Sequence, residues 1–317
     1  APFDYKFLIV KRDSGDVVVW EGRDNRQFTT MPESSDEALL VTGMRMVNSL
    51  QLWKGAGVAI PVFALRSQDD FGVGDFIDLK KMIDWAASTG QRFIQILPIN
   101  DTTMTHTWTD SYPYNANSTF ALHPMYLRVD LMGQLSDPGR RAYFDNERIA
   151  LNKLKQIDYE RVNNVKNEYT RELFKEDGAS VMATDEYKKF VARNESWLLP
   201  YAAFCTLRDI HSTADMSQWG EYSVYDKARV DEFIEAHREE IDYVCYIQYF
   251  LDKQLREVRT YAHSRGVAIK GDLPIGISRT SVDAWTSPRL FNLDSQAGAP
   301  PDDFSVLGQN WGFPTYN

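Results

Sequence analysis

The chain has 317 residues, of which 43% are hydrophobic and 25% are charged, the usual balance for a water-soluble folded protein. A chain of this length usually forms a main domain plus a smaller one. Its formal net charge of −10 and pI near 5.1 repel polyanions, which argues against nucleic acid or an anionic membrane as a partner. No apolar run approaches the ~18 residues of a membrane span, and APFDYKFLIV does not resemble a signal peptide, so we expect a cytoplasmic protein.

The cysteine count argues against a disulfide-stabilised scaffold. Only Cys205 and Cys245 occur, and both lie in stretches with a helical pattern. We therefore expect two free, buried thiols.

The first part of the chain is predicted to be a β-hairpin followed by a connector. Within residues 3–31, the apolar runs FDYKFLIV and DVVVWEG flank KRDSGD, which contains a good turn sequence. Residues 32–56 form the expected connector, and MPESSDEALL carries a helix-start signal.

A βαβ unit is predicted from residue 57 onward. GVAIPVFAL and RFIQILPI are apolar strands, and the helix FIDLKKMIDWAAS between them has Asp75 as a cap and Gly90 as a stop. One face of this helix should cover the sheet. That face consists of Phe76, Leu79, Ile83 and Ala86.

The remainder is predicted to be a long helical insertion followed by a third strand. Residues 136–262 are strongly charged and helical in pattern, which is typical of a subdomain outside a barrel. Gly266 closes the last helix, and VAIKGDLPI is the next buried strand.

Polar and aromatic residues follow each of the three predicted strands. Parallel α/β proteins place their active sites where strands end, so these residues should line one pocket. Six of the side chains are aromatic and two are carboxylates, a combination that suits sugars. The candidates are Asp101, Trp108, Tyr112, Tyr114 and Asp272, with Trp285, Phe304 and Trp311 above them.

The sequence gives no sign of a metal or a cofactor. DDFGVGD lacks the ligand spacing of an EF-hand, Gly72 and Gly74 lack the third glycine of a dinucleotide fingerprint, and the five histidines show no metal spacing. We therefore expect no cofactor and no metal.

Several long motifs resemble the 4-α-glucanotransferases, the amylomaltase or disproportionating-enzyme family. They include GVAIPVFALRSQDDFGVGDFIDLK, SYPYNANSTFALHPMYLRVD, VAIKGDLPIG and GAPPDDFSVLGQNWGFPTYN, in the family's order across residues 57–317. DSYPYN and GDLPIGISRTSVDAWTSPRLF are most similar to the branch with starch-binding modules ahead of the catalytic domain. The resemblance implies a partial (β/α)8 TIM barrel, with its first three strands and the insertion at 136–262.

The opening segment, YKFLIVKRDSGDVVVWEGRDNR, resembles the last strands of a family-20 starch-binding module. Residues 1–31 would then be the tail of such a β-sandwich. By this resemblance Lys6, Trp20, Glu21 and Asn25 would contact glucan.

The family implies transfer of α-1,4-glucan segments with retention, through a nucleophilic carboxylate, a Glu acid/base and a further Asp. In the family these groups follow the GQNWG loop, so we expect all three after Asn317 and none in this chain. The expected partners are maltooligosaccharides, starch or glycogen-like glucans. The sequence does not indicate an oligomeric state.

What matches the family here is the binding surface. By resemblance, it comprises Tyr114, Asp272, Pro301, Asp302, Phe304, Gln309 and Trp311. The covering loop usually reads PPDYF, whereas this chain has Asp303 in place of the tyrosine. Losing that aromatic contact would weaken the hold on donor glucan by about 1 to 3 kcal/mol.

Alternative interpretations stay open. Asp272 would otherwise be a turn residue before Pro274, Tyr114 a core tyrosine, and Trp20 a residue buried against the barrel. Lys6 and Glu21 would otherwise be solvated strand charges. The alternative for Trp108, Trp285 and Trp311 is a role as packing residues or loop anchors. At the level of function, the alternatives are a non-catalytic glucan-binding protein and an α-amylase-type hydrolase that prefers water to a sugar acceptor.

Overall fold

The computed structural model describes residues 3–30, 34, 36, 38, 40–47 and 54–317. The chain divides into two units, residues 1–55 and residues 56–317, and each is described by itself. Among the described residues, no helix is both long enough and apolar enough to cross a membrane.

The described residues of the first unit include four short strands in two antiparallel pairs. They are β1 (Phe3–Tyr5), β2 (Leu8–Val10), β3 (Val17–Trp20) and β4 (Arg26–Phe28). β2 pairs with β3, which confirms the predicted hairpin, and its turn contains Gly15 at a φ of 74°. β1 pairs with β4. The helix start predicted in 31–40 falls partly outside the described residues, and residues 34, 36, 38 and 40 are not helical.

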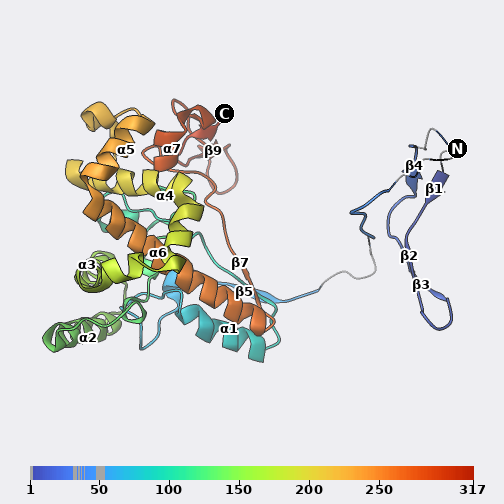
Figure 1. Ribbon diagram of the computed structural model, residues 1–317, viewed down its shortest axis with the longest axis horizontal. Helices are drawn as coiled ribbons and strands as arrows, with labels where there is room; N and C mark the ends of the chain where they lie inside the picture. Colours follow the sequence, from blue (N-terminus) through green and yellow to red (C-terminus); the bar gives the residue numbers. More distant parts are fainter. Residues whose placement is uncertain (1–2, 31–33, 35, 37, 39, 48–53) are drawn as a thin grey trace. The chain divides into compact units, whose positions relative to one another are not determined.

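The second unit is built on a three-stranded parallel sheet (Figure 1). Its strands are β5 (Gly57–Ala59), β6 (Phe93–Gln95) and β7 (Ala268–Lys270), in the order β5-β6-β7. Helix α1 (Asp78–Ser88) connects β5 to β6, so the predicted βαβ unit is confirmed. Its predicted face of Phe76, Leu79, Ile83 and Ala86 is fully buried.

The strands are shorter than the apolar runs that predicted them. Each run contains a proline a few residues beyond the observed strand end: Pro61, Pro98 and Pro274. Proline has no amide hydrogen for the ladder and restricts the residue before it, so regular pairing stops ahead of it. After β5, for example, Pro61 leads into a 3-10 turn, Val62–Ala64.

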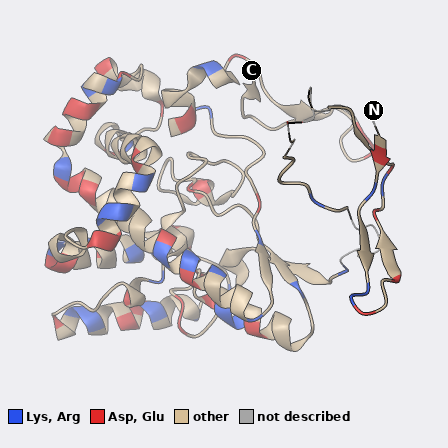
Figure 2. Cartoon of the chain, turned by 45° about the vertical axis from the view of Figure 1, so that its right-hand side comes forward, with Lys and Arg blue, Asp and Glu red and all other residues tan. Residues whose placement is uncertain are grey.

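The stretch predicted to be helical, residues 136–262, forms helices between β6 and β7. Its helices are α2 (Pro138–Asn152), α3 (Tyr159–Met182), α4 (Asp185–His211), α5 (Lys227–Ala236) and α6 (Arg238–Ser264). Side chains cap four of them, since Asp137, Asp158, Thr184 and Asp226 accept hydrogen bonds from first-turn amides. Charged residues lie along these helices (Figure 2).

The last of these helices also belongs to the sheet layer. α6 contacts both α1 and β7, and Figure 1 shows it running beside α1. Gly266, at a φ of 69°, ends it as predicted. One hydrophobic core therefore joins the sheet to the helical insertion, with α4 and α6 supplying many of its side chains. Cys205 and Cys245 are free and buried within this core, as expected.

Beyond β7 the chain forms a long irregular segment with short pairings. Its elements are α7 (Val282–Thr286), β8 (Phe291–Asn292), β9 (Gly298–Ala299), β10 (Gln309–Asn310) and β11 (Thr315–Tyr316). β9 pairs with β10 and β8 with β11, both antiparallel. The β9–β10 ladder closes the loop that carries residues 300–308.

Candidate functional site

Tyr114 and Asp272, which are 158 residues apart in sequence, meet at the edge of the sheet where β6 and β7 end. The Tyr114 hydroxyl donates to Asp272 Oδ2 at 2.9 Å. Asp272 follows β7 by two residues, and its Oδ1 accepts the Leu273 amide at 3.1 Å. Both side chains are half-buried, so the pair combines fixed geometry with access from solvent.

The backbone on either side of this pair is joined directly. Ala116 forms a parallel bridge with Ile277, and Ala116 O accepts the Ser278 amide at 2.8 Å. Asn117 O accepts the Val282 amide at 2.9 Å. The loop after β6 and the segment after β7 therefore hold the tyrosine and the carboxylate in register.

The hydrogen bond to Asp272 favours the protonated form of Tyr114. Its hydrogen bond to Asp272, with some desolvation, raises the pKa of Tyr114 above its usual value. The Tyr112 ring lies 5.7 Å from the Tyr114 ring and is 59% exposed. Two aromatic faces beside a carboxylate that accepts hydrogen bonds suit a ligand with apolar ring faces and hydroxyl edges.

The predicted covering loop is ordered by its own polar groups. Asp302 Oδ1 accepts the Phe304 amide at 2.9 Å, and the Trp311 Nε1 donates to Gln309 Oε1 at 3.0 Å. Pro301 and Asp302 are exposed, and the Phe304 side chain is 98% exposed. The tip of this loop therefore presents an apolar ring to solvent.

The base of the loop is anchored beside the end of β7. An ideal Cβ on Gly276 would lie 2.2 Å from the Phe313 ring, so only glycine leaves room for that ring. Phe313 is buried, and its ring centroid is 6.0 Å from that of Trp311. The end of the loop therefore lies beside Gly276, four residues after Asp272.

Asp101 was expected in the same pocket, but the structure places it in the interior. Its side chain is 1% exposed. Burial by itself raises the pKa of Asp101, but nearby His123 and Arg208 and hydrogen bonds from Thr103 and Asn117 outweigh it, so the pKa lies below the ordinary value. Asp101 is therefore a buried carboxylate that holds the loop, which corrects the prediction.

Two predicted tryptophans also lie elsewhere. Trp285 is 3% exposed, packs edge-on against Trp219 and Tyr225, and donates its Nε1 to Tyr222 O at 2.9 Å. Of the two roles open to Trp285, the structure shows packing and not a place above the pocket, because α7 turns the ring into the core. Trp108 is 69% exposed and lines a separate hollow of about 510 Å³.

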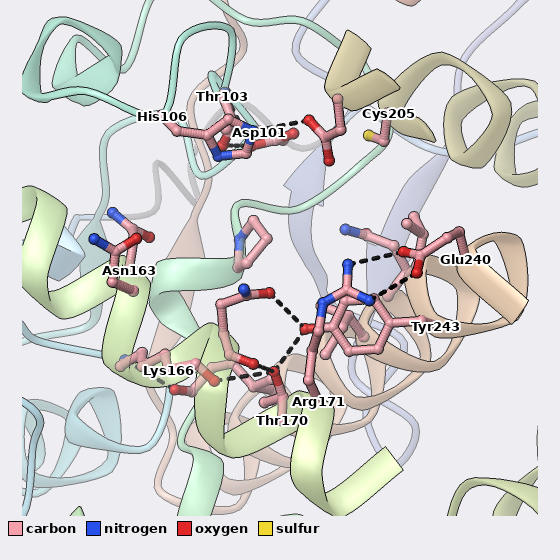
Figure 3. A pocket seen from close by; sticks show the side chains of 18 of the residues that line it. Asp101, Thr103, His106, Asn163, Lys166, Thr170, Arg171, Cys205, Glu240 and Tyr243 are labelled. Carbon is pink, nitrogen blue, oxygen red and sulfur yellow. Dashed lines mark hydrogen bonds and ion pairs between the residues drawn. The ribbon is translucent and has the colours of Figure 1, made fainter. Parts of the chain in front are cut away.

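A second cavity, of about 180 Å³, lies between the loop after β6 and helices α3, α4 and α6 (Figure 3). Its walls mix apolar and polar side chains, and most of its charges are paired. Arg171 holds Glu240 through two hydrogen bonds, and His106 Nε2 lies 2.8 Å from Asp209 Oδ1. Neither Tyr114 nor Asp272 lines this cavity or the one at Trp108.

The four residues predicted to contact glucan in the first unit differ in their exposure. Trp20 is 57% exposed and Asn25 is exposed, whereas Lys6 is half-buried. The Glu21 carboxylate is buried and occupied by Arg26 and by the Val47 amide. The hydrogen bond from Arg26 lowers the pKa of Glu21 to about 2. Trp20 is thus the large apolar side chain of the four that is open to a ligand.

Sequence reasoning missed the network behind the site. Tyr201, on α4, donates its hydroxyl to Asp101 Oδ2 at 2.8 Å, and Asn117 bridges Asp101 to the loop that carries Tyr114. Tyr201 lies in an apolar helical run, where a tyrosine looks like a core residue. Among the described residues, no group of three or more His, Cys, Asp or Glu could hold a metal ion.

A sequence profile described as 4-alpha-glucanotransferase matches residues 60–317. The chain belongs to this family. It is 46% identical to the rice (Oryza sativa subsp. japonica) "4-alpha-glucanotransferase DPE2" over 100% of its own length and 34% of that protein. It is 32% identical to the "4-alpha-glucanotransferase" of Chlamydia muridarum, over 82% of this chain and 49% of that protein.

The similarity extends to solved amylomaltase structures. The amylomaltase from Streptococcus agalactiae in complex with acarbose superposes with a TM-score of 0.66 at 28% identity, covering 83% of this chain and 53% of that one. This supports a TIM-barrel-type fold, as expected. The chain spans about a third to a half of the length of the relatives it matches.

Proposed function

We propose that the intact protein is a 4-α-glucanotransferase that moves α-1,4-glucan segments between maltooligosaccharides or glycogen-like glucans. The observation that carries the proposal is the Tyr114–Asp272 pair, held at the carboxyl edge of the sheet in a chain of this family. In this proposal the pair binds a donor sugar, with Asp272 accepting hydrogen bonds from sugar hydroxyls and the tyrosine ring packing on a sugar face.

The covering loop is proposed to close over the donor. Its exposed Phe304 would pack on the bound glucan, while Gln309 and Trp311 shape the loop's base. Asp303 stands where the family's loop usually has tyrosine, so in this proposal the loop lacks that aromatic contact with the donor. We assign binding to these residues and leave bond cleavage to carboxylates outside them, acting by double displacement with retention.

A further part of the proposal is glucan binding by the first unit. Its support is Trp20, an exposed aromatic side chain on β3. Glu21 then acts indirectly, since its contacts with Arg26 and the Val47 amide fix the chain after β3.

The decisive experiment is to incubate the intact protein with maltotriose and to analyse the products by chromatography. Transfer should give glucose together with maltodextrins longer than maltotriose. An α-amylase-type hydrolase would instead give glucose and maltose without longer products. A non-catalytic glucan-binding protein would leave maltotriose unchanged while still binding it.

A further inference from the structure

One face of helix α4 holds the loop that follows β6. Tyr201 and Arg208 are seven residues apart, which places them on the same side of the helix. The Tyr201 hydroxyl donates to Asp101 Oδ2, and Arg208 NH1 donates to Thr103 O, both at 2.8 Å. The helical insertion therefore contacts the start of this loop at two points, one buried at Tyr201 and one partly buried at Arg208.

Asp101 links the Tyr201 hydrogen bond to Asn117, further along the loop. Asp101 Oδ2, the atom that Tyr201 contacts, also accepts Asn117 Nδ2 at 2.8 Å. The Asp101 backbone carbonyl accepts the Asn117 amide at 2.8 Å. Asn117 Nδ2 also donates to Thr103 O at 2.8 Å, the same carbonyl that Arg208 holds. Asn117 is thus fixed by its backbone and its side chain to atoms that α4 also contacts.

Asn117 in turn lies next to the candidate binding pair. It is three residues after Tyr114, and its carbonyl accepts the Val282 amide at 2.9 Å. The adjoining bridge between Ala116 and Ile277 joins the loop to the segment that begins at Asp272. A shift of Asn117 would therefore move the tyrosine relative to the carboxylate it contacts.

We infer that Tyr201 is a positioning residue for donor binding, acting through Asp101 and Asn117 on the Tyr114–Asp272 pair. This inference rests on the proposed function. Removing the Tyr201 hydroxyl leaves Asp101, a fully buried carboxylate, with one donor fewer. The remaining donors, Thr103 and Asn117, have to rearrange around it, because an unsatisfied buried charge is costly.

The test uses Tyr201→Phe in the intact protein, with Tyr246→Phe as the matched control. The Tyr246 hydroxyl donates to Asp177 Oδ1 at 2.9 Å, so the control also deletes a tyrosine–carboxylate hydrogen bond inside the helical insertion. Neither Tyr246 nor Asp177 contacts the loop after β6 through any hydrogen bond between described residues. The control therefore reports what loss of such a bond does to stability alone.

The expected result is a rise in KM for maltotriose of about tenfold in Tyr201→Phe with kcat within about twofold, the pattern seen when ground state and transition state lose binding equally. Tyr246→Phe should keep the wild-type KM. Calorimetric titration with maltotriose should show the same tenfold loss of affinity in Tyr201→Phe. Equal KM values for the two variants would overturn the inference, whatever their melting temperatures.

A double-mutant cycle tests whether Tyr201 affects donor binding through the Tyr114–Asp272 pair. If Tyr201 acts through the pair, its substitution should change KM much less in a Tyr114→Phe background than in the wild type. Additive effects would contradict this route. The two proposals fail differently: a wild-type protein without transfer or binding refutes the proposed function and this inference together. A wild-type protein that transfers, with Tyr201→Phe behaving like Tyr246→Phe, refutes only the inference.

Discussion

The buried ion pairs of Arg128 give a sharp test of what holds the sheet unit together. Arg128 Nε lies 2.5 Å from Asp75 Oδ2, and its NH2 lies 2.9 Å from Asp78 Oδ1. The three side chains are at most 5% exposed. Asp75 also accepts the amides of Ile77 and Asp78, so the cluster fixes the start of α1. Arg128→Met would keep much of the side-chain volume and leave two carboxylates buried without their cation.

Removing one partner of a buried ion pair costs about 3 to 5 kcal/mol. At about 2 to 4 °C per kcal/mol for a domain of this size, the melting temperature should fall by about 6 to 20 °C. Differential scanning calorimetry of the intact protein at pH 8 measures this. Arg238→Met is the control, since the Arg238 pairs with Glu235 and Asp242 lie on the surface and such pairs contribute about 0 to 1 kcal/mol.

The loss of melting temperature in Arg128→Met should depend on pH in a defined direction. Burial raises the pKa of Asp75 to about 6 in the folded protein, with Lys166 and Arg128 opposing the rise, from an ordinary value of 3.8. Removing the Arg128 cation raises the pKa of Asp75 further. A carboxyl whose folded-state pKa exceeds its unfolded-state pKa stabilises the fold when it takes up its proton. The loss of melting temperature should therefore be smaller at pH 5.5 than at pH 8.

A loss below about 3 °C at pH 8 would refute the reasoning, as would a loss that grows on acidification. The double variant Arg128→Met with Asp75→Asn provides an internal check. It removes one of the two unpaired charges and should regain part of the lost stability.

Three further predictions concern glucan binding by the intact protein. Tyr114→Phe should raise KM for maltotriose by about 10- to 150-fold, because a hydrogen bond to a charged group is worth about 1.5 to 3 kcal/mol when fully formed; an unchanged KM would separate the pair from donor binding. Asp303→Tyr should lower KM by about 5-fold or more, through an aromatic contact of about 1 to 3 kcal/mol, whereas a higher KM would show that the loop tip does not reach the donor. Trp20→Ala should weaken retention on immobilised starch without changing kcat on maltotriose, and equal retention would exclude Trp20 as a starch contact.

The βαβ unit was predictable because its signals are local. The spacing of Leu79, Ile83 and Ala86 defines one helix face, and Gly90 marks its end, so neither depends on distant residues. Strand lengths were overestimated for the opposite reason. An apolar run shows that a segment is buried, whereas a proline within it decides how much of that segment can pair.

The site was only partly predictable. Position after a strand located Tyr114 and Asp272 at the same edge of the sheet, and the family motifs singled out both. The same rule failed for Asp101 and Trp285, because it does not determine whether a side chain turns toward solvent or toward the helices behind the loop. Tyr201 was missed because its partner, Asp101, is 100 residues away and nothing in the local sequence marks the contact.

The two buried thiols can report when helices α4 and α6 separate. Cys205 and Cys245 are the chain's only cysteines, both lie in the core shared by α4 and α6, and burial raises the pKa of each to about 12. A thiolate-selective reagent should therefore leave the folded chain unmodified and label it only when those helices separate. Labelling followed by mass spectrometry would then time the separation of the insertion in every variant above, without adding a dye or a tag.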